Sequence, residues 1–158
     1  MDEWTRRLIG LGLVVVTNVA PWAAGKLFGA RLNLPLDFGT TLGDGSRVLG
    51  EHKTWRGLVA GVLACALAAQ LLGCGFALGL AFGSLSLAAD TVSSFAKRRL
   101  SVAPGHEFPI LDQLPEALLP LIVLSRPLEL GILECFGLAG VFSLLDLATL
   151  RLRHRESR

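Results

Sequence analysis

Two segments of the sequence hold acidic, basic and glycine residues at spacings suited to binding phosphate groups and a divalent cation. The first, residues 36–57, combines acids and bases with glycines at positions 39, 43, 45, 50 and 57. The second begins at Asp90, passes through Lys97 and Arg98 and ends at Asp112 and Gln113. Carboxylates are ligands that Mg²⁺ takes together with substrate phosphates. Basic side chains and backbone N–H groups near glycines bind the phosphates. The sequence therefore predicts a phosphate-binding site built from both segments.

Asp90 is the clearest candidate for a functional acid. It stands in an apolar segment without another acid, one helical turn before Ser93 and Ser94 and about two turns before Lys97. A carboxylate at membrane depth is costly and indicates a functional site. Asp90 and Asp112, at the two ends of the second segment, could together hold Mg²⁺. The alternative is a structural ion pair between Asp90 and a neighbouring lysine or arginine.

The basic residues allow two interpretations. Lys97, Arg98 and Arg99 could bind a phosphate substrate, or they could only follow the positive-inside rule and contact anionic lipid headgroups. The second interpretation is weaker for Lys53 and Arg56, because their glycine-rich, acid-containing surroundings go beyond what membrane topology requires.

Other polar residues receive less specific predictions. Glu134 and Asp146 also lie within an apolar segment, and no basic cluster adjoins either residue in the sequence, so we expect them to line a polar cavity or to be structural. The three histidines lack metal-ligand spacing, and His106 is either a substrate contact or a surface loop residue. The three cysteines lack a CxxC spacing and are expected to be small apolar residues on helices.

The elements that must position these residues are apolar helices. The chain has 158 residues, enough for one domain, with 52% hydrophobic and 18% charged residues and a mean hydropathy of +0.57. This composition excludes a disordered chain and an ordinary soluble domain, and the net charge of +2 does not suggest a nucleic-acid partner. A spanning helix needs about 20 apolar residues. We therefore predict an all-α integral membrane protein in a single domain, with about five transmembrane helices at 8–27, 57–73, 75–95, 111–124 and 128–150.

Two of these segments carry alternatives. The first, preceded by Arg6 and Arg7, also has the form of a secretory signal peptide, but four further apolar segments favour an uncleaved helix. The fourth is short and contains Pro115 and Pro120, so it could be a tilted or re-entrant helix.

The orientation follows from the distribution of lysine and arginine. Of 15 such residues, Arg6, Arg7 and Arg126 fall on one side of the predicted bundle and the other twelve on the opposite side. We therefore predict the N-terminus outside, the C-terminus in the cytoplasm, and cytoplasmic loops at 29–56 and 97–110. Glycines four residues apart, at 57 and 61 and at 75, 79 and 83, are expected to let helices pack closely inside the bundle.

Three stretches of the sequence resemble one family. DGSRVLGEHKTWRG at 44–57, ADTVSSFAKRR at 89–99 and FPILDQL at 108–114 closely resemble motifs of CDP-archaeol synthases, as does Asn18 followed by Pro21. The resemblance covers most of the chain, and the second half is similar to the core of phosphatidate cytidylyltransferases. Two positions depart from the family pattern. Ala89 stands where the family usually has Gly, and Pro115, followed by Glu116, stands where it usually has an acid.

The resemblance implies a five-span cytidylyltransferase of the cell (inner) membrane, with its active site facing the cytoplasm. It would join CTP and a lipid phosphate, with Mg²⁺, and yield a CDP-lipid and pyrophosphate. The resemblance assigns metal binding to Asp90 and Asp112, and catalysis to these acids and Lys97. It assigns substrate binding to six residues: Asp44, Lys53, Thr54, Arg56, Ser94 and Arg98. Such a reaction needs positioning and neutralisation of phosphate charge more than acid–base chemistry.

Two other functions are compatible with the sequence. A non-catalytic membrane protein that binds anionic lipid or nucleotide would keep the basic clusters, and the departures at Ala89 and Pro115 are consistent with it. A small transporter could line its path with Asp90, Glu134 and Asp146, but no inverted repeat is visible. The Leu, Val and Ala surfaces of the helices fit isoprenoid ether chains and acyl chains equally, and the sequence makes no prediction of oligomeric state.

Overall fold

The structure of the chain is a computed structural model that describes the backbone of residues 2–100 and 109–156 and the side chains of residues 2–100 and 113–149. Within these residues the chain forms five helices, which confirms the predicted all-helical class. They are α1 (Glu3–Phe28), α2 (Trp55–Leu71), α3 (Phe76–Arg99), α4 (Pro109–Val123) and α5 (Ile132–Glu156). Each of the five predicted apolar segments overlaps one helix.

Three helices in the described part of the chain are long and apolar enough to cross a membrane: α1, α3 and residues Ile132–Thr149 of α5. By contrast, α2 has 17 residues, and the described apolar part of α4 covers Gln113–Val123. At about 1.5 Å per residue, both are shorter than a hydrocarbon core of about 30 Å. The structure supports a membrane-embedded helical protein, and membrane crossing by α2 and α4 stays a prediction.

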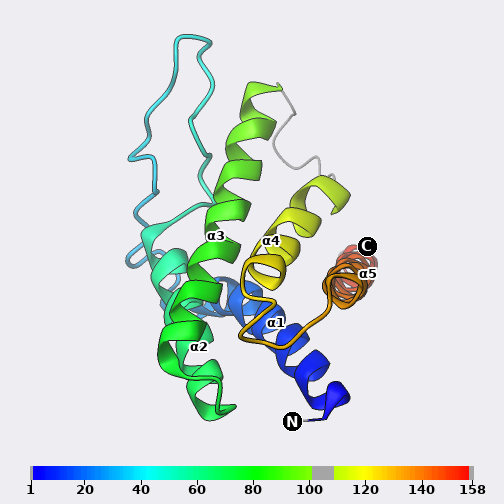
Figure 1. The fold of residues 1–158 in the computed structure, drawn as a ribbon. Coiled ribbons are helices and arrows are strands. Elements are labelled where there is room, and N and C mark those ends of the chain that lie inside the picture. The colour runs from blue at the N-terminus through cyan, green and yellow to red at the C-terminus, as the bar shows by residue number, and fades with distance from the viewer. Residues whose placement is uncertain (1, 101–108, 157–158) are drawn as a thin grey trace.

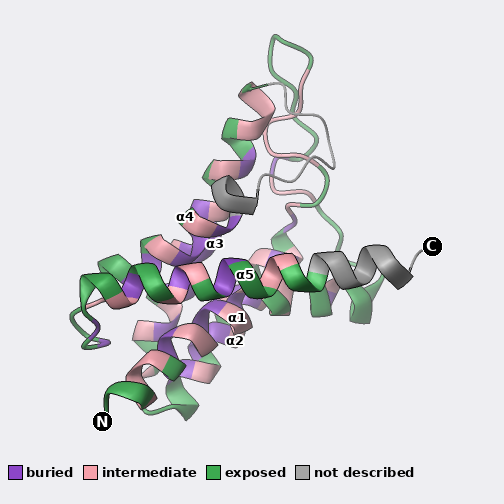
Figure 2. Ribbon diagram, turned by 90° about the vertical axis from the view of Figure 1, so that its right-hand side faces the viewer, coloured by how far each residue is buried: buried purple, intermediate pink, exposed green. Residues whose placement is uncertain are grey.

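The helices pack around α3, which lies between α2 and α4 (Figure 1). α1 packs against α2, and α5 packs against α4. α2 and α3 run in opposite directions because Gly73 and Gly75, with φ angles of 79° and 90°, make a tight turn between them. α5 is seen end-on in Figure 1 and lies across the other helices in Figure 2. The buried core is apolar and includes Leu13, Val14, Cys65, Phe82, Leu121 and Cys135.

Glycines make the contact between α2 and α3 close. A Cβ on Gly79 would lie 2.6 Å from the backbone of Cys65 and Ala66, and a Cβ on Gly83 would lie 3.0 Å from Val62. These distances are too short for any side chain at Gly79, so the helices approach each other there only because it is glycine. The predicted internal packing of these two glycines is confirmed. Cys65 and Cys135 are buried on helices as expected, whereas Cys74 lies in the turn after α2.

The end of α3 differs from the predicted loop boundary. Lys97, Arg98 and Arg99 form the last turn of α3 instead of beginning a loop at residue 97. Cations are favoured there because the last free carbonyl groups and the negative end of the helix dipole lie at a helix C-terminus. The connection to α4 begins at Leu100, and His106 lies outside the described residues, in the stretch 101–108.

The connection between α1 and α2, residues 29–54, stands beside the C-terminal half of α3 (Figure 1). Hydrogen bonds from Arg99 hold the loop against α3. The Nη1 of Arg99 donates to Asp44 Oδ2 at 2.7 Å, and its Nη2 donates to the carbonyl oxygen of Arg47 at 2.8 Å. This loop and the basic end of α3 therefore form one charged region at the same end of the molecule.

Asp37 is the central hydrogen-bond acceptor of this loop. Its side chain is 1% exposed and accepts a hydrogen bond from Arg47 Nη2 at 2.6 Å. It also accepts hydrogen bonds from the backbone N–H groups of Gly39, Leu49 and Gly50 at 3.0, 3.1 and 3.2 Å. Burial opposes the charge on Asp37, but the Arg47 guanidinium and the three N–H donors outweigh it and hold its pKa well below the ordinary value. The loop is a folded element with its own polar core.

Candidate active site

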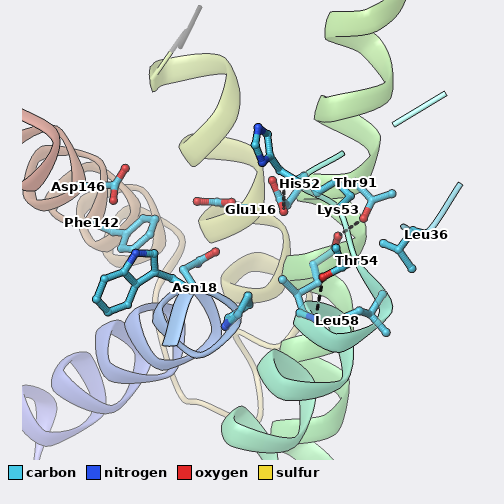
Figure 3. Close-up of a pocket in the computed structure, with 15 residues that line it drawn as sticks. Asn18, Leu36, His52, Lys53, Thr54, Leu58, Thr91, Glu116, Phe142 and Asp146 are labelled. Carbon is cyan, nitrogen blue, oxygen red and sulfur yellow. Dashed lines mark hydrogen bonds and ion pairs between the residues drawn. The ribbon is translucent and has the colours of Figure 1, made fainter. Parts of the chain in front are cut away.

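A cavity of about 310 Å³ lies where all five helices meet the end of the loop between α1 and α2. Figure 3 shows Lys53, Glu116 and Asp146 reaching it from the loop, α4 and α5. The other lining residues are Asn18, Pro21, Trp22, Leu36, His52, Thr54, Gly57, Leu58, Leu87, Asp90, Thr91 and Phe142. Electrostatic interactions between charged groups are stronger in such a place, because a cavity between apolar helices has a lower dielectric constant than water.

Lys53 and Asp90 form an ion pair on the wall of this cavity. The Nζ of Lys53 donates to Oδ2 of Asp90, and the two side chains are 26% and 20% exposed. The backbone of Lys53 is held because its carbonyl oxygen accepts from Leu36 N at 2.8 Å. Asp90 therefore does form an ion pair, as the alternative interpretation expects, but with a lysine 37 positions away in the other segment. The pair places an ammonium and a carboxylate side by side on the cavity wall.

Thr54 joins this loop to α2. It is the N-cap residue, and its Oγ1 accepts a hydrogen bond from Gly57 N at 3.2 Å. Such a cap satisfies a backbone N–H that the helix itself leaves unpaired. Of the predicted site residues with described side chains, the structure brings Lys53, Thr54 and Asp90 to the cavity.

Two predicted substrate-binding residues are engaged elsewhere. Asp44 pairs with Arg99, and its pKa is lowered, chiefly because Ser46 N donates to its Oδ1 at 3.0 Å. Arg56 donates from Nη1 to the carbonyl oxygens of Gly29 and residue 31 at 2.8 and 2.7 Å. In this structure Asp44 fastens the loop to α3, and Arg56 joins the start of α2 to the end of α1.

Ser94, Lys97 and Arg98 follow Asp90 along α3. Ser94 is buried one turn after Asp90, and Lys97 and Arg98 lie in the last turn of the helix. Arg98 approaches the loop, since a Cβ on Gly50 would lie 3.6 Å from its Nε. The three residues stand beyond the cavity lining, toward the charged end of α3.

Asp112 lies on α4, four residues before Glu116, and residues four apart share a helix face. Glu116 is 8% exposed and lines the cavity. The side chain of Asp112 lies outside the described part of the chain, so its role stays a prediction. Glu116 was not predicted as a site residue. The available signal was an acid in an apolar segment, directly after Pro115.

Asp146 of α5 also reaches the cavity. The Nε2 of Gln113 donates to Oδ2 of Asp146 and joins α4 to α5. The sequence left open whether Asp146 and Glu134 line a cavity or are structural. The structure gives the two acids different environments. Asp146 lines the cavity, whereas Glu134 accepts from Arg7 Nε at 2.5 Å and from Gly131 N at 2.7 Å near the start of α5.

The composition of the cavity fits a magnesium ion held jointly with substrate phosphates. Mg²⁺ is usually bound by one or two carboxylates, with phosphate oxygens and water completing its shell. Asp90, Glu116 and Asp146 all line this space. Among the described side chains, no three His, Cys, Asp or Glu residues stand close enough to form a metal centre by themselves. The described residues therefore offer carboxylates for such an ion but no complete metal centre.

The fold and the site define a class of protein. It is a helical membrane protein whose polar cavity is lined by carboxylates and a lysine. Comparison with known proteins narrows this class, because residues 11–76 and 72–149 match the family model of CarS-like CDP-archaeol synthase. The chain belongs to the CDP-archaeol synthase family, as the sequence motifs indicated.

Individual relatives agree with this assignment. The CDP-archaeol synthases of Methanopyrus kandleri and Aeropyrum pernix are 38% and 39% identical to this chain over 70% and 72% of its length. That of Thermofilum pendens is 39% identical over 63% of the chain. The matches cover 66%, 66% and 51% of these relatives, so the chain spans between half and two thirds of their length. A solved structure described as an intramembrane enzyme for archaeal membrane lipids biosynthesis matches with a TM-score of 0.77, at 32% identity over 90% of both chains.

Proposed function

We propose that this protein is a CTP-dependent cytidylyltransferase that joins CMP to a membrane lipid phosphate. Family membership supports this function, and the observation that carries it is the Lys53–Asp90 pair on the wall of a cavity lined by all five helices. A phosphate substrate needs cations and metal-binding carboxylates in one place. The cavity offers both.

The reaction exchanges one phosphoryl bond for another. An oxygen of the lipid phosphate attacks the α-phosphorus of CTP, a new P–O–P linkage forms, and the bond to the β-phosphate breaks as pyrophosphate leaves. Catalysis rests on holding the two phosphates in line and offsetting their charge. When bound, Mg²⁺ would offset the charge on the phosphate oxygens and on the leaving pyrophosphate. Asp90 and Asp112 are the residues proposed to hold it.

The remaining proposed roles fall to groups around the cavity. Lys53 keeps Asp90 neutralised until substrate phosphates enter, and its flexible side chain then turns to a phosphate oxygen while its backbone stays fixed. Lys97 offsets charge on the reacting phosphates. Phosphate and nucleotide contacts are assigned to Asp44, Thr54, Arg56, Ser94 and Arg98. Asp44 and Arg56 would contribute after the loop rearranges, because other residues now engage them.

We also propose that all five helices cross the cell membrane, with the N-terminus outside and the site facing the cytoplasm. The charged loop and the basic end of α3 lie at one end of the molecule, which supports this orientation (Figure 1). CTP would then arrive from the cytoplasm and the lipid phosphate from the bilayer. The names of the relatives favour an archaeol-type lipid phosphate as the acceptor.

The experiment is a label-transfer assay with purified protein in lipid nanodiscs, Mg²⁺ and CTP labelled at the α-phosphate. Isoprenoid ether and diacyl lipid phosphates are offered separately. The proposal predicts labelled lipid and an equal amount of pyrophosphate, with the ether lipid as the better acceptor. Binding of CTP or lipid without product from either acceptor would favour a non-catalytic binding protein instead.

A further inference from the structure

A side-chain hydrogen bond joins the start of α4 to α5. Gln113, which is 6% exposed, donates from Nε2 to Oδ2 of Asp146. Gln113 directly follows Asp112, and Asp146 lies one helical turn after Phe142 on the face of α5 that lines the cavity. The bond therefore lies next to the proposed metal-binding position, and its acceptor is on α5, a helix that contains none of the family motifs.

A hydrogen bond to α5 is important for the first turn of α4, because prolines remove backbone hydrogen bonds from this helix. Pro115 and Pro120 lie inside α4. Proline has no N–H, so Pro115 cannot donate to the carbonyl of Leu111, and its ring crowds that carbonyl. Residues 109–114 are consequently held by fewer backbone hydrogen bonds than a regular helix would provide. A buried amide such as that of Gln113 also requires an acceptor, since an unpaired buried donor is costly.

We propose that Asp146 is a positioning residue of the active site. Its carboxylate fixes Gln113 and thereby the rotation of the α4 turn that carries Asp112, where Pro115 has removed part of the backbone support. This inference rests on the proposed function for its catalytic consequence. Its structural consequence, an ordered first turn of α4, can be measured without any activity.

Four variants test the inference. Asp146→Ala removes the acceptor, and Asp146→Asn keeps an acceptor oxygen without the charge. Gln113→Ala removes the donor. Thr149→Val is the matched control on α5, because Thr149 is exposed and its Oγ1 donates to the backbone oxygen of Asp146, at 2.8 Å, and not to its carboxylate. Thermal unfolding of each variant identifies any that fails to fold.

Hydrogen–deuterium exchange is the first readout. We expect faster exchange at Gln113, Leu114 and residues 116–118, whose N–H groups donate to the carbonyls of the first turns of α4, in Asp146→Ala and Gln113→Ala. Exchange should be as in wild type in Asp146→Asn and Thr149→Val. Unchanged exchange in the first two variants would overturn the inference, whether or not the protein is an enzyme. A general loss of protection throughout the chain would overturn it too, because the effect would then not be local to α4.

Kinetics and metal binding are the second readout. Asp146→Ala and Gln113→Ala should lower kcat about tenfold or more and weaken Mn²⁺ binding in the presence of CTP, with the KM for CTP within about twofold. A double variant that combines Gln113→Ala with Asp146→Ala should be no worse than either single variant, and Asp146→Asn should retain at least about half of the wild-type kcat. If Asp146→Asn is as impaired as Asp146→Ala, the charge itself is needed and Asp146 contacts substrate or metal. Failure of wild-type protein to form any CDP-lipid would refute the proposed function and leave the exchange result to decide this inference.

Discussion

The ammonium of Lys53 contacts the carboxylate of Asp90, and this contact joins the loop between α1 and α2 to the middle of α3. Each residue offsets a charge that would otherwise be costly between apolar helices. The contact also places the cation that a phosphate needs beside the acid that a metal needs. Together with the contacts of Arg99, it links the two charged segments of the sequence.

Lys53→Met should lower kcat/KM for CTP about 10- to 100-fold, because a charge-assisted contact to a phosphate is lost and Asp90 is left without its partner. Lys53→Arg keeps the charge but changes the donor geometry, so it should retain part of the activity. Steady-state kinetics with varied CTP measures both effects. Activity of Lys53→Met equal to wild type would exclude Lys53 from the site.

Asp37→Asn should lower the free energy of unfolding by about 1–3 kcal/mol at pH 7, because the loop loses an ionic acceptor of four hydrogen bonds. The pKa of Asp37 is lowered in the folded protein. Its contribution is therefore complete above the unfolded value of about 4 and declines as the pH falls below it, toward the folded pKa. Thermal unfolding at pH 7, 4 and 3 should show a decline in wild type that is smaller in the variant. Equal pH dependence in both proteins would contradict this role.

Gly79→Ala should destabilise the helix bundle by about 1–3 kcal/mol, because the new Cβ would lie 2.6 Å from the backbone of α2. Gly137→Ala is the matched control in α5, since a Cβ there meets nothing within 4 Å. That change should be neutral or stabilising by up to about 1 kcal/mol. Thermal unfolding in detergent compares them. Equal melting temperatures would mean that the close contact between α2 and α3 is absent in the folded protein.

Membrane orientation can be tested with one introduced cysteine at a time in a background that lacks Cys74, because the two remaining cysteines, Cys65 and Cys135, are buried. The proposed topology places Gly43 in the cytoplasm and Arg126 outside, and both positions are exposed. A membrane-impermeant maleimide added to intact cells should label Arg126→Cys and leave Gly43→Cys unlabelled until the cells are opened. The reverse pattern would invert the orientation, and labelling of both sites in intact cells would refute the span count.

The helices could be predicted from the sequence because apolar length and glycine spacing are local properties. The residues of the site could be predicted from the sequence only in part. The family motifs identified Lys53, Thr54 and Asp90, which do reach the cavity, but contact across 37 positions depends on how the loop folds around Asp37. Asp146 was left with two alternatives, since no basic residue lies within four positions of it in the sequence. Glu116 was noted only as the acid after Pro115. The engagement of Asp44 by Arg99 was not visible, because it requires α3 to continue through residue 99.

The most direct test of the proposed site is CDP-lipid formation by Asp90→Asn. Glu134→Gln serves as the control, because Glu134 is also an acid in an apolar helix but pairs with Arg7 outside the cavity. With CTP, Mg²⁺ and the ether lipid phosphate at saturation, Asp90→Asn should lower the rate about 100-fold or more, whereas Glu134→Gln should stay within about threefold of wild type. Folded Asp90→Asn protein that forms CDP-lipid at the wild-type rate would contradict the assignment of this cavity as the active site.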